Sequence, residues 1–160
     1  MALHIGFVGS RCRPLVERLA RSGHAVGWHA PAMEPFAGVT AFSNAVEVAR
    51  ALAAPRIAWL DLPTGYSTEL AIQDVWPEFS PGDVIVDSGA GTCDDGRRRA
   101  AALASARMWF VDARIVRENG MALFLGGDAA AIAIVAPYAG VLAAGWTHCG
   151  AAGTGYTAAP

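Results

Sequence analysis

Short strand-like runs alternate with helical patterns along all 160 residues, and this alternation restricts the fold more than any other feature. The strand-like runs are rich in β-branched and aromatic residues, and the stretches between them carry apolar residues at helical spacing. Parallel strands must be joined by a crossover, which is usually a helix. The sequence therefore predicts a Rossmann-like α/β domain with a doubly wound, mostly parallel sheet and helices on both faces.

The expected elements form one domain over residues 1–150, followed by a short tail over 151–160. Strands are expected at Leu3–Val8, Ala25–His29, Val39–Phe42, Arg56–Leu62, Asp83–Asp87, Met108–Val111, Met121–Leu125 and Trp146–Cys149. Helices are expected at Pro14–Arg21, at Ser43–Arg50 with Ser43 as its cap, and at Tyr66–Val75, Asp94–Ala106 and Asp128–Leu142.

The composition indicates what kind of partner to expect. Apolar residues make up 54% of the chain and charged residues only 16%, so we expect apolar surface that faces a second copy or another protein. The net charge is −2, and the most basic stretch, Arg97–Arg99, is interpreted as the solvated face of a helix. We expect no nucleic-acid partner.

Cysteine use and hydropathy bear on the location of the protein. The three cysteines form no C-x-x-C pair, so we expect neither a disulfide framework nor a metal site. Met1 leads directly into a strand-like run, and no apolar run approaches the roughly 18 residues of a membrane span. A cytoplasmic protein that does not enter the membrane is expected.

The residues after each strand should decide the function, because ligands of open α/β sheets bind at the carboxyl ends of the strands. A dinucleotide site would read G-x-G-x-x-G from Gly9, but only Gly9 is a glycine. Arg11 stands where backbone must approach pyrophosphate, and Pro14 stands where glycine allows close helix packing. His29 ends the second strand, where NAD sites carry a carboxylate.

Other chemistry at the same edge stays open. Arg11 and Arg13 at a helix N-terminus are expected either to hold a small phosphate or carboxylate or to be solvated. Asp61 and Asp87 end apolar strands, where each is either a general acid or base or a hydrogen-bonded structural carboxylate. His29 is the best proton-transfer candidate, with a structural role as the alternative.

Two interpretations are also open for Cys12, one functional and one structural. It lies between two arginines at a helix N-terminus, so it is either a reactive thiol of lowered pKa or a small packing residue.

Several segments, in this order, resemble the cofactor-binding half of 6-phosphogluconate dehydrogenase and its β-hydroxyacid dehydrogenase relatives. These segments are His4–Gly9, Arg21–Val26, Trp59–Gly65, Pro81–Asp87, Phe110–Asp112, and Trp146–Gly150 followed by Gly153–Gly155. The resemblance implies oxidation of a β-hydroxyacid with NAD or NADP. It places Gly9, Arg11, Arg13 and Thr64 at a vestigial cofactor site, or at a site for phosphate or carboxylate.

The motifs that carry this activity in the family are missing at the matching positions. Ala90 replaces the asparagine that positions substrate and nicotinamide, and Ala113–Gly120 is shorter than the family's Ser-Gly-Gly substrate loop and lacks it. Tyr156–Pro160 holds no catalytic lysine, and all twelve basic residues of the chain are arginines. The family's second, all-helical domain is expected to be absent.

Three functions therefore remain open. The first is a cofactor-free partner or regulatory subunit without dehydrogenase activity. The second is a non-redox biosynthetic enzyme, such as a lyase, isomerase or cyclase, that uses the crevice carboxylates on a small molecule. The third is an oxidoreductase that still binds NADP or NAD. The replaced glycines of the dinucleotide motif disfavour this function, so we expect no cofactor.

Overall fold

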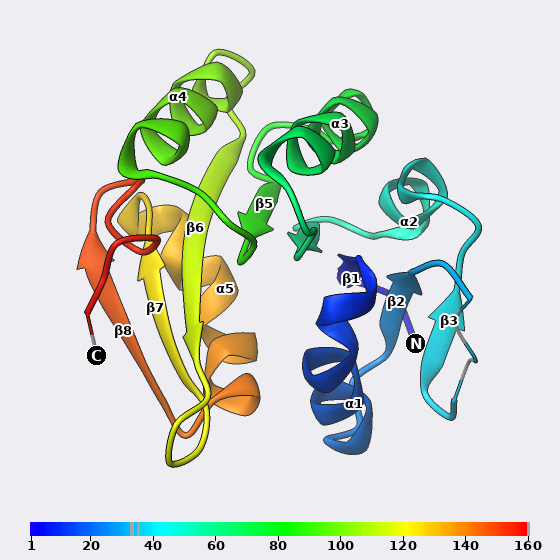
Figure 1. Ribbon diagram of the computed structural model, residues 1–160. Coiled ribbons are helices and arrows are strands. Elements are labelled where there is room, and N and C mark those ends of the chain that lie inside the picture. The colour runs from blue at the N-terminus through cyan, green and yellow to red at the C-terminus, as the bar shows by residue number, and fades with distance from the viewer. Residues whose placement is uncertain (33, 35, 160) are drawn as a thin grey trace.

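The computed structural model describes residues 1–32, 34 and 36–159, which form one eight-stranded sheet (Figure 1). The strand order is β3-β2-β1-β4-β5-β6-β7-β8, and only the β6–β7 pair is antiparallel. The strands are β1 (Ile5–Val8), β2 (Val26–His29), β3 (Val39–Ala41), β4 (Ile57–Leu60), β5 (Val84–Asp87), β6 (Trp109–Val116), β7 (Ala122–Gly126) and β8 (Gly145–Gly150). This doubly wound, mostly parallel sheet confirms the predicted fold class.

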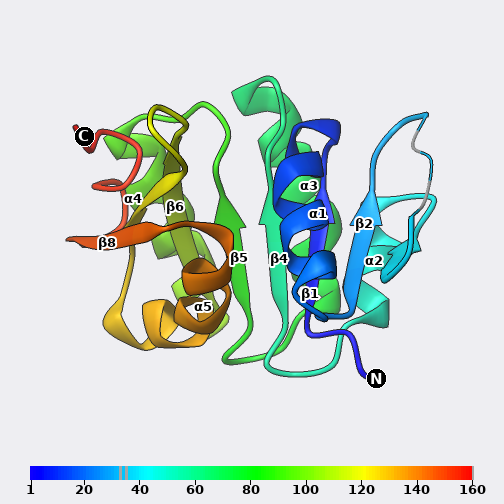
Figure 2. The same ribbon diagram turned by 90° about the horizontal axis from the view of Figure 1, so that it is seen from below.

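Helices cover both faces of the sheet, as Figures 1 and 2 show. One layer holds α1 (Arg13–Arg21) and α5 (Ala129–Leu142), and the other holds α2 (Ala45–Ala51), α3 (Gly65–Val75) and α4 (Cys93–Ala104). Short 3₁₀ turns, Ser10–Cys12 and Trp76–Glu78, precede α1 and follow α3. Successive side chains of a strand point to opposite faces, so Ile57 and Trp59 join one apolar core while Ala58 and Leu60 join the other.

The structure corrects the sequence prediction at β6. The strand was expected to end at Val111, but it continues to Val116 and pairs with β7 from Asp112 opposite Gly126 to Val116 opposite Ala122. Its pairing with β5 ends at Asp112, opposite Asp87. In the described part of the chain, the second half of β6 therefore has a strand neighbour on one side only, and it extends past the carboxyl end of β5. The segment Ala113–Gly120, which was interpreted as a shortened substrate loop, forms the end of β6 and part of the turn that leads to β7.

Two smaller predictions were wrong as well. Asn44, not Ser43, caps α2, because its side chain accepts a hydrogen bond from the Glu47 N–H at 2.9 Å. Arg99 is only 3% exposed rather than solvated, since it shares the inner face of α4 with Leu103. At Cys12 the structure decides between the two alternatives: the thiol is fully buried and burial raises its pKa, which favours the packing role.

The chain after β8 packs back against the sheet. The buried carboxylate of Asp112 accepts hydrogen bonds from the backbone N–H groups of Gly153 and Tyr156. Gly96 and Gly153 approach so closely that a Cβ on Gly96 would lie 2.6 Å from the Gly153 Cα. The residues after 150 are thereby held against α4 and β6.

None of the helices that the structure describes is long and apolar enough to cross a membrane. Within the same residues, no three His, Cys, Asp or Glu side chains are grouped to hold a metal ion.

Candidate functional site

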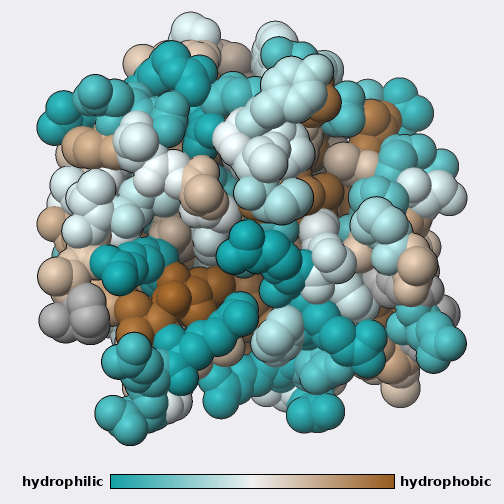
Figure 3. Space-filling view, in the orientation of Figure 1, coloured by the Kyte–Doolittle hydropathy of each residue, from teal (hydrophilic) through white to brown (hydrophobic). Residues whose placement is uncertain are grey.

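A cavity of about 660 Å³ opens at the carboxyl edge of the sheet, beside the switch point between β1 and β4. The extended half of β6 forms one wall, and the residues that follow β1, β4 and β5 form the others. Figure 3 shows an apolar area over β6 and β7, with hydrophilic residues along its borders. The lining residues are Arg11, Asp61, Ser88–Gly91, Ala113–Glu118 and Tyr156.

Gly9 makes the turn from β1 possible. Its φ of 120° suits glycine, and a Cβ at this position would lie 2.3 Å from the Asp61 carbonyl oxygen. The Trp28 indole N–H donates to the Gly9 carbonyl oxygen at 2.9 Å. Close packing of β1 against β4 is therefore sufficient to require this glycine.

Arg11 lies at the cavity and faces a buried carboxylate. Its Nε is 3.3 Å from Asp61 Oδ1, and the Arg11 side chain is 57% exposed whereas that of Asp61 is 3% exposed. The Ser88 hydroxyl donates to Asp61 Oδ2 at 3.2 Å. Oδ1 accepts no hydrogen bond from the described residues, since the nearby guanidinium is not aligned to donate one.

The pKa of Asp61 is raised because burial disfavours its charged form. Arg11, Ser88 and Arg117 oppose this shift, in decreasing order. Asp61 is thus a cavity carboxylate with one occupied and one free oxygen.

Ser88 was not singled out from the sequence. Besides its bond to Asp61, its hydroxyl oxygen accepts a hydrogen bond from the Trp59 indole N–H at 2.8 Å. The available signal was its position directly after β5, where side chains reach the carboxyl edge of the sheet.

Asp87 belongs to a different environment from Asp61. It is fully buried and accepts hydrogen bonds from the Tyr156 hydroxyl, from Arg99 Nη1 at 3.4 Å and from the Gly89 N–H at 3.0 Å. Burial raises its pKa to about 6, although the Tyr156 hydrogen bond lowers it. Asp87 does not line the cavity, whereas Tyr156 does.

The remaining predicted site residues lie outside the cavity lining and have other partners. His29 Nδ1 is 2.9 Å from the Phe42 carbonyl oxygen. Arg13 pairs with Glu17 at 2.8 Å and stacks over the Phe36 ring. Thr64 caps α3 by accepting a hydrogen bond from the Ser67 N–H at 3.0 Å.

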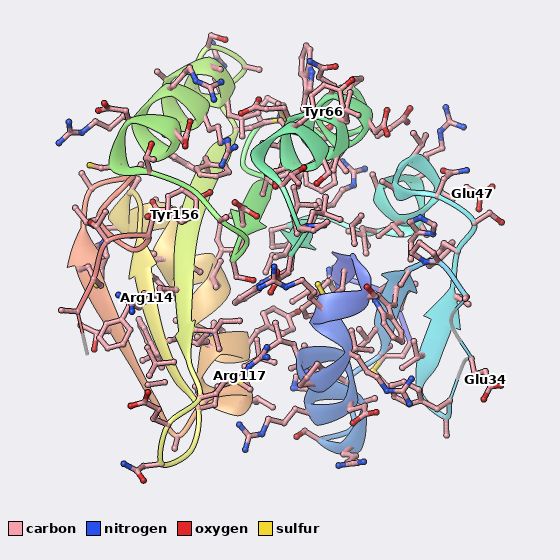
Figure 4. The ribbon with its side chains drawn as sticks, in the orientation of Figure 1. Glu34, Glu47, Tyr66, Arg114, Arg117 and Tyr156 are labelled. Carbon is pink, nitrogen blue, oxygen red and sulfur yellow. The ribbon has the colours of Figure 1, made fainter. Side chains whose placement is uncertain are left out.

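Three cavity residues were not among the site residues predicted from the sequence: Arg114, Arg117 and Tyr156. Figure 4 shows Arg117 between β6 and α1, with Arg114 and Tyr156 on the side of β6 nearer β7. Arg114 Nη1 donates to the Ala158 carbonyl oxygen. The alternation of Val111, Ala113 and Ile115 with polar residues was the signal that could have predicted the longer strand.

The sequence model for the NAD binding domain of 6-phosphogluconate dehydrogenase matches residues 4–150, which include every strand described above. The chain belongs to this family. The match confirms the resemblance stated from the sequence.

Individual relatives agree with this assignment. The Bacillus subtilis (strain 168) protein named "Putative 6-phosphogluconate dehydrogenase YqeC" is 29% identical over 126 residues, which cover 74% of this chain and 42% of that protein. The structure of Mycobacterium tuberculosis 3-hydroxyisobutyrate dehydrogenase with L-serine superposes with a TM-score of 0.83 at 27% identity, covering 98% of this chain and 57% of that one. An imine reductase variant from Myxococcus stipitatus in complex with NAD⁺ shares the fold, with a TM-score of 0.83 at 16% identity over 98% of this chain and 58% of that one. The chain thus spans about half the length of these relatives.

Proposed function

We propose that this domain is a family member without dehydrogenase activity, which binds a small molecule in the cavity instead of NAD or NADP. In this role it acts as a regulatory or partner subunit. The Arg11–Asp61 pair carries the proposal. Both residues line the cavity, and Arg11 occupies the position of the family's second glycine.

A dinucleotide needs backbone N–H groups within reach of its pyrophosphate. The Arg11 side chain lies on this approach, and Pro14 fills the first turn of α1 where a third glycine would stand. At the ribose end, His29 replaces the usual carboxylate and its Nδ1 is already engaged. These residues do not fit the family's way of holding the cofactor.

The positions for the hydride-transfer chemistry support the same proposal. Ala90 lines the cavity where the family resemblance calls for asparagine, and its methyl group forms no hydrogen bond. The chain contains no lysine to serve as the family's proton-transfer residue.

An NAD(P)-linked oxidoreductase is the second candidate. The family match over residues 4–150 and the retained Gly9 turn favour it. In this case Arg11 would leave Asp61 and bind phosphate, as its 57% exposed side chain has room to do.

Thermal unfolding with about 1 mM NADPH, NADH, NADP⁺ or NAD⁺ separates the two candidates, because a ligand specific for the folded state raises its stability. We expect no shift for the unmodified protein. A saturating shift would overturn the proposal, and its loss in Arg11→Ala but not in Arg21→Ala would assign cofactor binding to Arg11. Arg21 is a suitable control, since its side chain is 80% exposed and lies on α1.

A further inference from the structure

We propose that the ligand of the cavity is a small molecule with a protonated amine at one end and an acidic group, carboxylate or phosphate, at the other. The amine binds Asp61, and the acidic group binds Arg117. This inference rests on the proposed function, because it names the class of ligand for the same cavity.

The free oxygen of Asp61 indicates the amine. A carboxylate buried to 3% exposure needs donors for both oxygens, but only Oδ2 receives one, from Ser88. The Arg11 guanidinium contributes charge at 3.3 Å without a hydrogen bond. Oδ1 is itself buried beside Arg11, so an ammonium group reaches it when the 57% exposed Arg11 side chain turns aside. The ammonium group would then supply both the hydrogen bond and a positive charge, which a neutral hydroxyl cannot do.

Arg117 at the β6 wall indicates the acidic group. It is exposed and lines the cavity, and it has no ion-pair partner within 4.0 Å among the residues that the structure describes. Arg114 lies on the other side of β6 and donates to the Ala158 carbonyl oxygen, so it adds positive charge to this wall without sharing the acidic group with Arg117 (Figure 4). Glu118 is the opposing charge beside them, so the guanidinium groups outnumber the carboxylates on this wall. Arginine forks match carboxylate and phosphate geometry.

Apolar side chains also line the cavity. Ala113, Ile115 and Val116 lie on the same wall as the two arginines. They suit the methylene groups that separate an amine from an acid. The cavity volume of about 660 Å³ is in the range of small-molecule sites.

Calorimetric titration with three matched probes tests the proposal: 5-aminopentanoate, pentanoate and pentylamine. The first carries both charges, and each of the others carries one. We expect 5-aminopentanoate to bind at least about tenfold more tightly than either single-charge probe. Equal affinities for 5-aminopentanoate and pentanoate, or no binding of any probe, would overturn the proposal.

Variants of Asp61 and Arg117 test which residue binds each end of the ligand. In Asp61→Asn the advantage of 5-aminopentanoate over pentanoate should disappear, whereas in Arg117→Gln its advantage over pentylamine should fall. Asp94→Asn and Arg97→Gln are the controls, since these exposed α4 residues pair with each other at 3.6 Å and lie outside the cavity. If Asp61→Asn keeps the full advantage, the amine does not bind at Asp61 and the inference is wrong. Should this variant not fold, the three probes on the unmodified protein still decide.

Two further titrations complete the design. Comparing the affinities of 2-aminoethyl phosphate and 3-aminopropanoate shows whether the acidic group is phosphate or carboxylate. Either result supports the proposal if the tighter of the two binds more tightly than the singly charged probes. NADPH is titrated in parallel. NADPH binding would overturn the proposed function, whereas a missing preference for doubly charged probes without NADPH binding would overturn the ligand class alone.

Discussion

Three neighbouring strands, β4, β5 and β6, each place a buried carboxylate at or near the carboxyl edge of the sheet, but two of these carboxylates differ sharply from the third. Asp87 and Asp112 receive hydrogen bonds from Arg99, Tyr156, the Gly89 N–H and the backbone after β8. Asp61 receives one, from Ser88, and its buried Oδ1 accepts none from the described residues.

The difference teaches that burial alone does not distinguish a structural carboxylate from a functional one. The chain itself supplies the donors for Asp87 and Asp112, so these groups hold the tail in place. For Asp61 the described residues donate to one of the two oxygens only. Three variants test this contrast.

Removing Asp112 should have the largest effect on stability. In Asp112→Ala the backbone N–H groups of Gly153 and Tyr156 lose their acceptor, which should lower the free energy of unfolding by about 3 kcal/mol. Urea unfolding measures the change, with Asp94→Ala as the exposed control. A loss below about 1 kcal/mol would show that the carboxylate does not anchor the tail.

Asp87 should make stability depend on pH. Its pKa is about 6 in the folded protein against about 3.9 unfolded, so its stabilising contribution is complete below pH 4 and is lost as the pH rises through 6. The loss is on the order of 3 kcal/mol. Urea unfolding at pH 4.5 and 7.5 tests this direction. Glu69 and Asp95 have lowered pKa values, so their contributions are lost at lower pH.

A tyrosine variant separates Asp87 from these other groups. Tyr156→Phe removes the hydroxyl that donates to Asp87, so the pKa of Asp87 should rise further. Carboxyl NMR titration measures it, with Tyr66→Phe as the control because Tyr66 is 75% exposed. An unchanged or lowered pKa in Tyr156→Phe would contradict the assigned hydrogen bond.

Asp61→Asn should have the smallest effect on the ligand-free protein. The variant removes a buried charge that has one unpartnered oxygen, and it loses the attraction of an arginine that is 57% exposed. These effects oppose each other, so unfolding by urea should change by less than about 1 kcal/mol in either direction. A loss as large as that of Asp112→Ala would place Asp61 among the structural carboxylates.

The sequence was sufficient to predict the strands, the helices and their arrangement in layers, because buried parallel strands and amphipathic helices produce strong patterns of apolar residues in the sequence. It failed at β6, where only β7 pairs with the second half and the polar residues at 114, 117 and 118 resemble a loop. It failed at Arg99 too, since three consecutive arginines conceal that one shares the spacing of Gly96 and Leu103 on the inner face of α4.

The candidate site was predictable only in part. Arg11 and Asp61 could be named because the carboxyl ends of β1 and β4 meet at the switch point. Tyr156 could not be placed there, because its position depends on how the tail folds back onto Asp112. His29, Arg13 and Thr64 were named because they lie at or after the ends of strands, but their side chains have local partners outside the cavity.

The second half of β6 pairs with a strand on one side only, so the β6–β7 hairpin is a part of this protein that evolution or engineering can lengthen without disturbing the core. Side chains alternate along a strand, so residues added in pairs to both arms of the hairpin would keep Arg114 and Ile115 on their present faces. A single added residue would exchange those faces and replace charge with hydrocarbon. The repertoire of ligands could thus change through hairpin length while the sheet beneath remains the same.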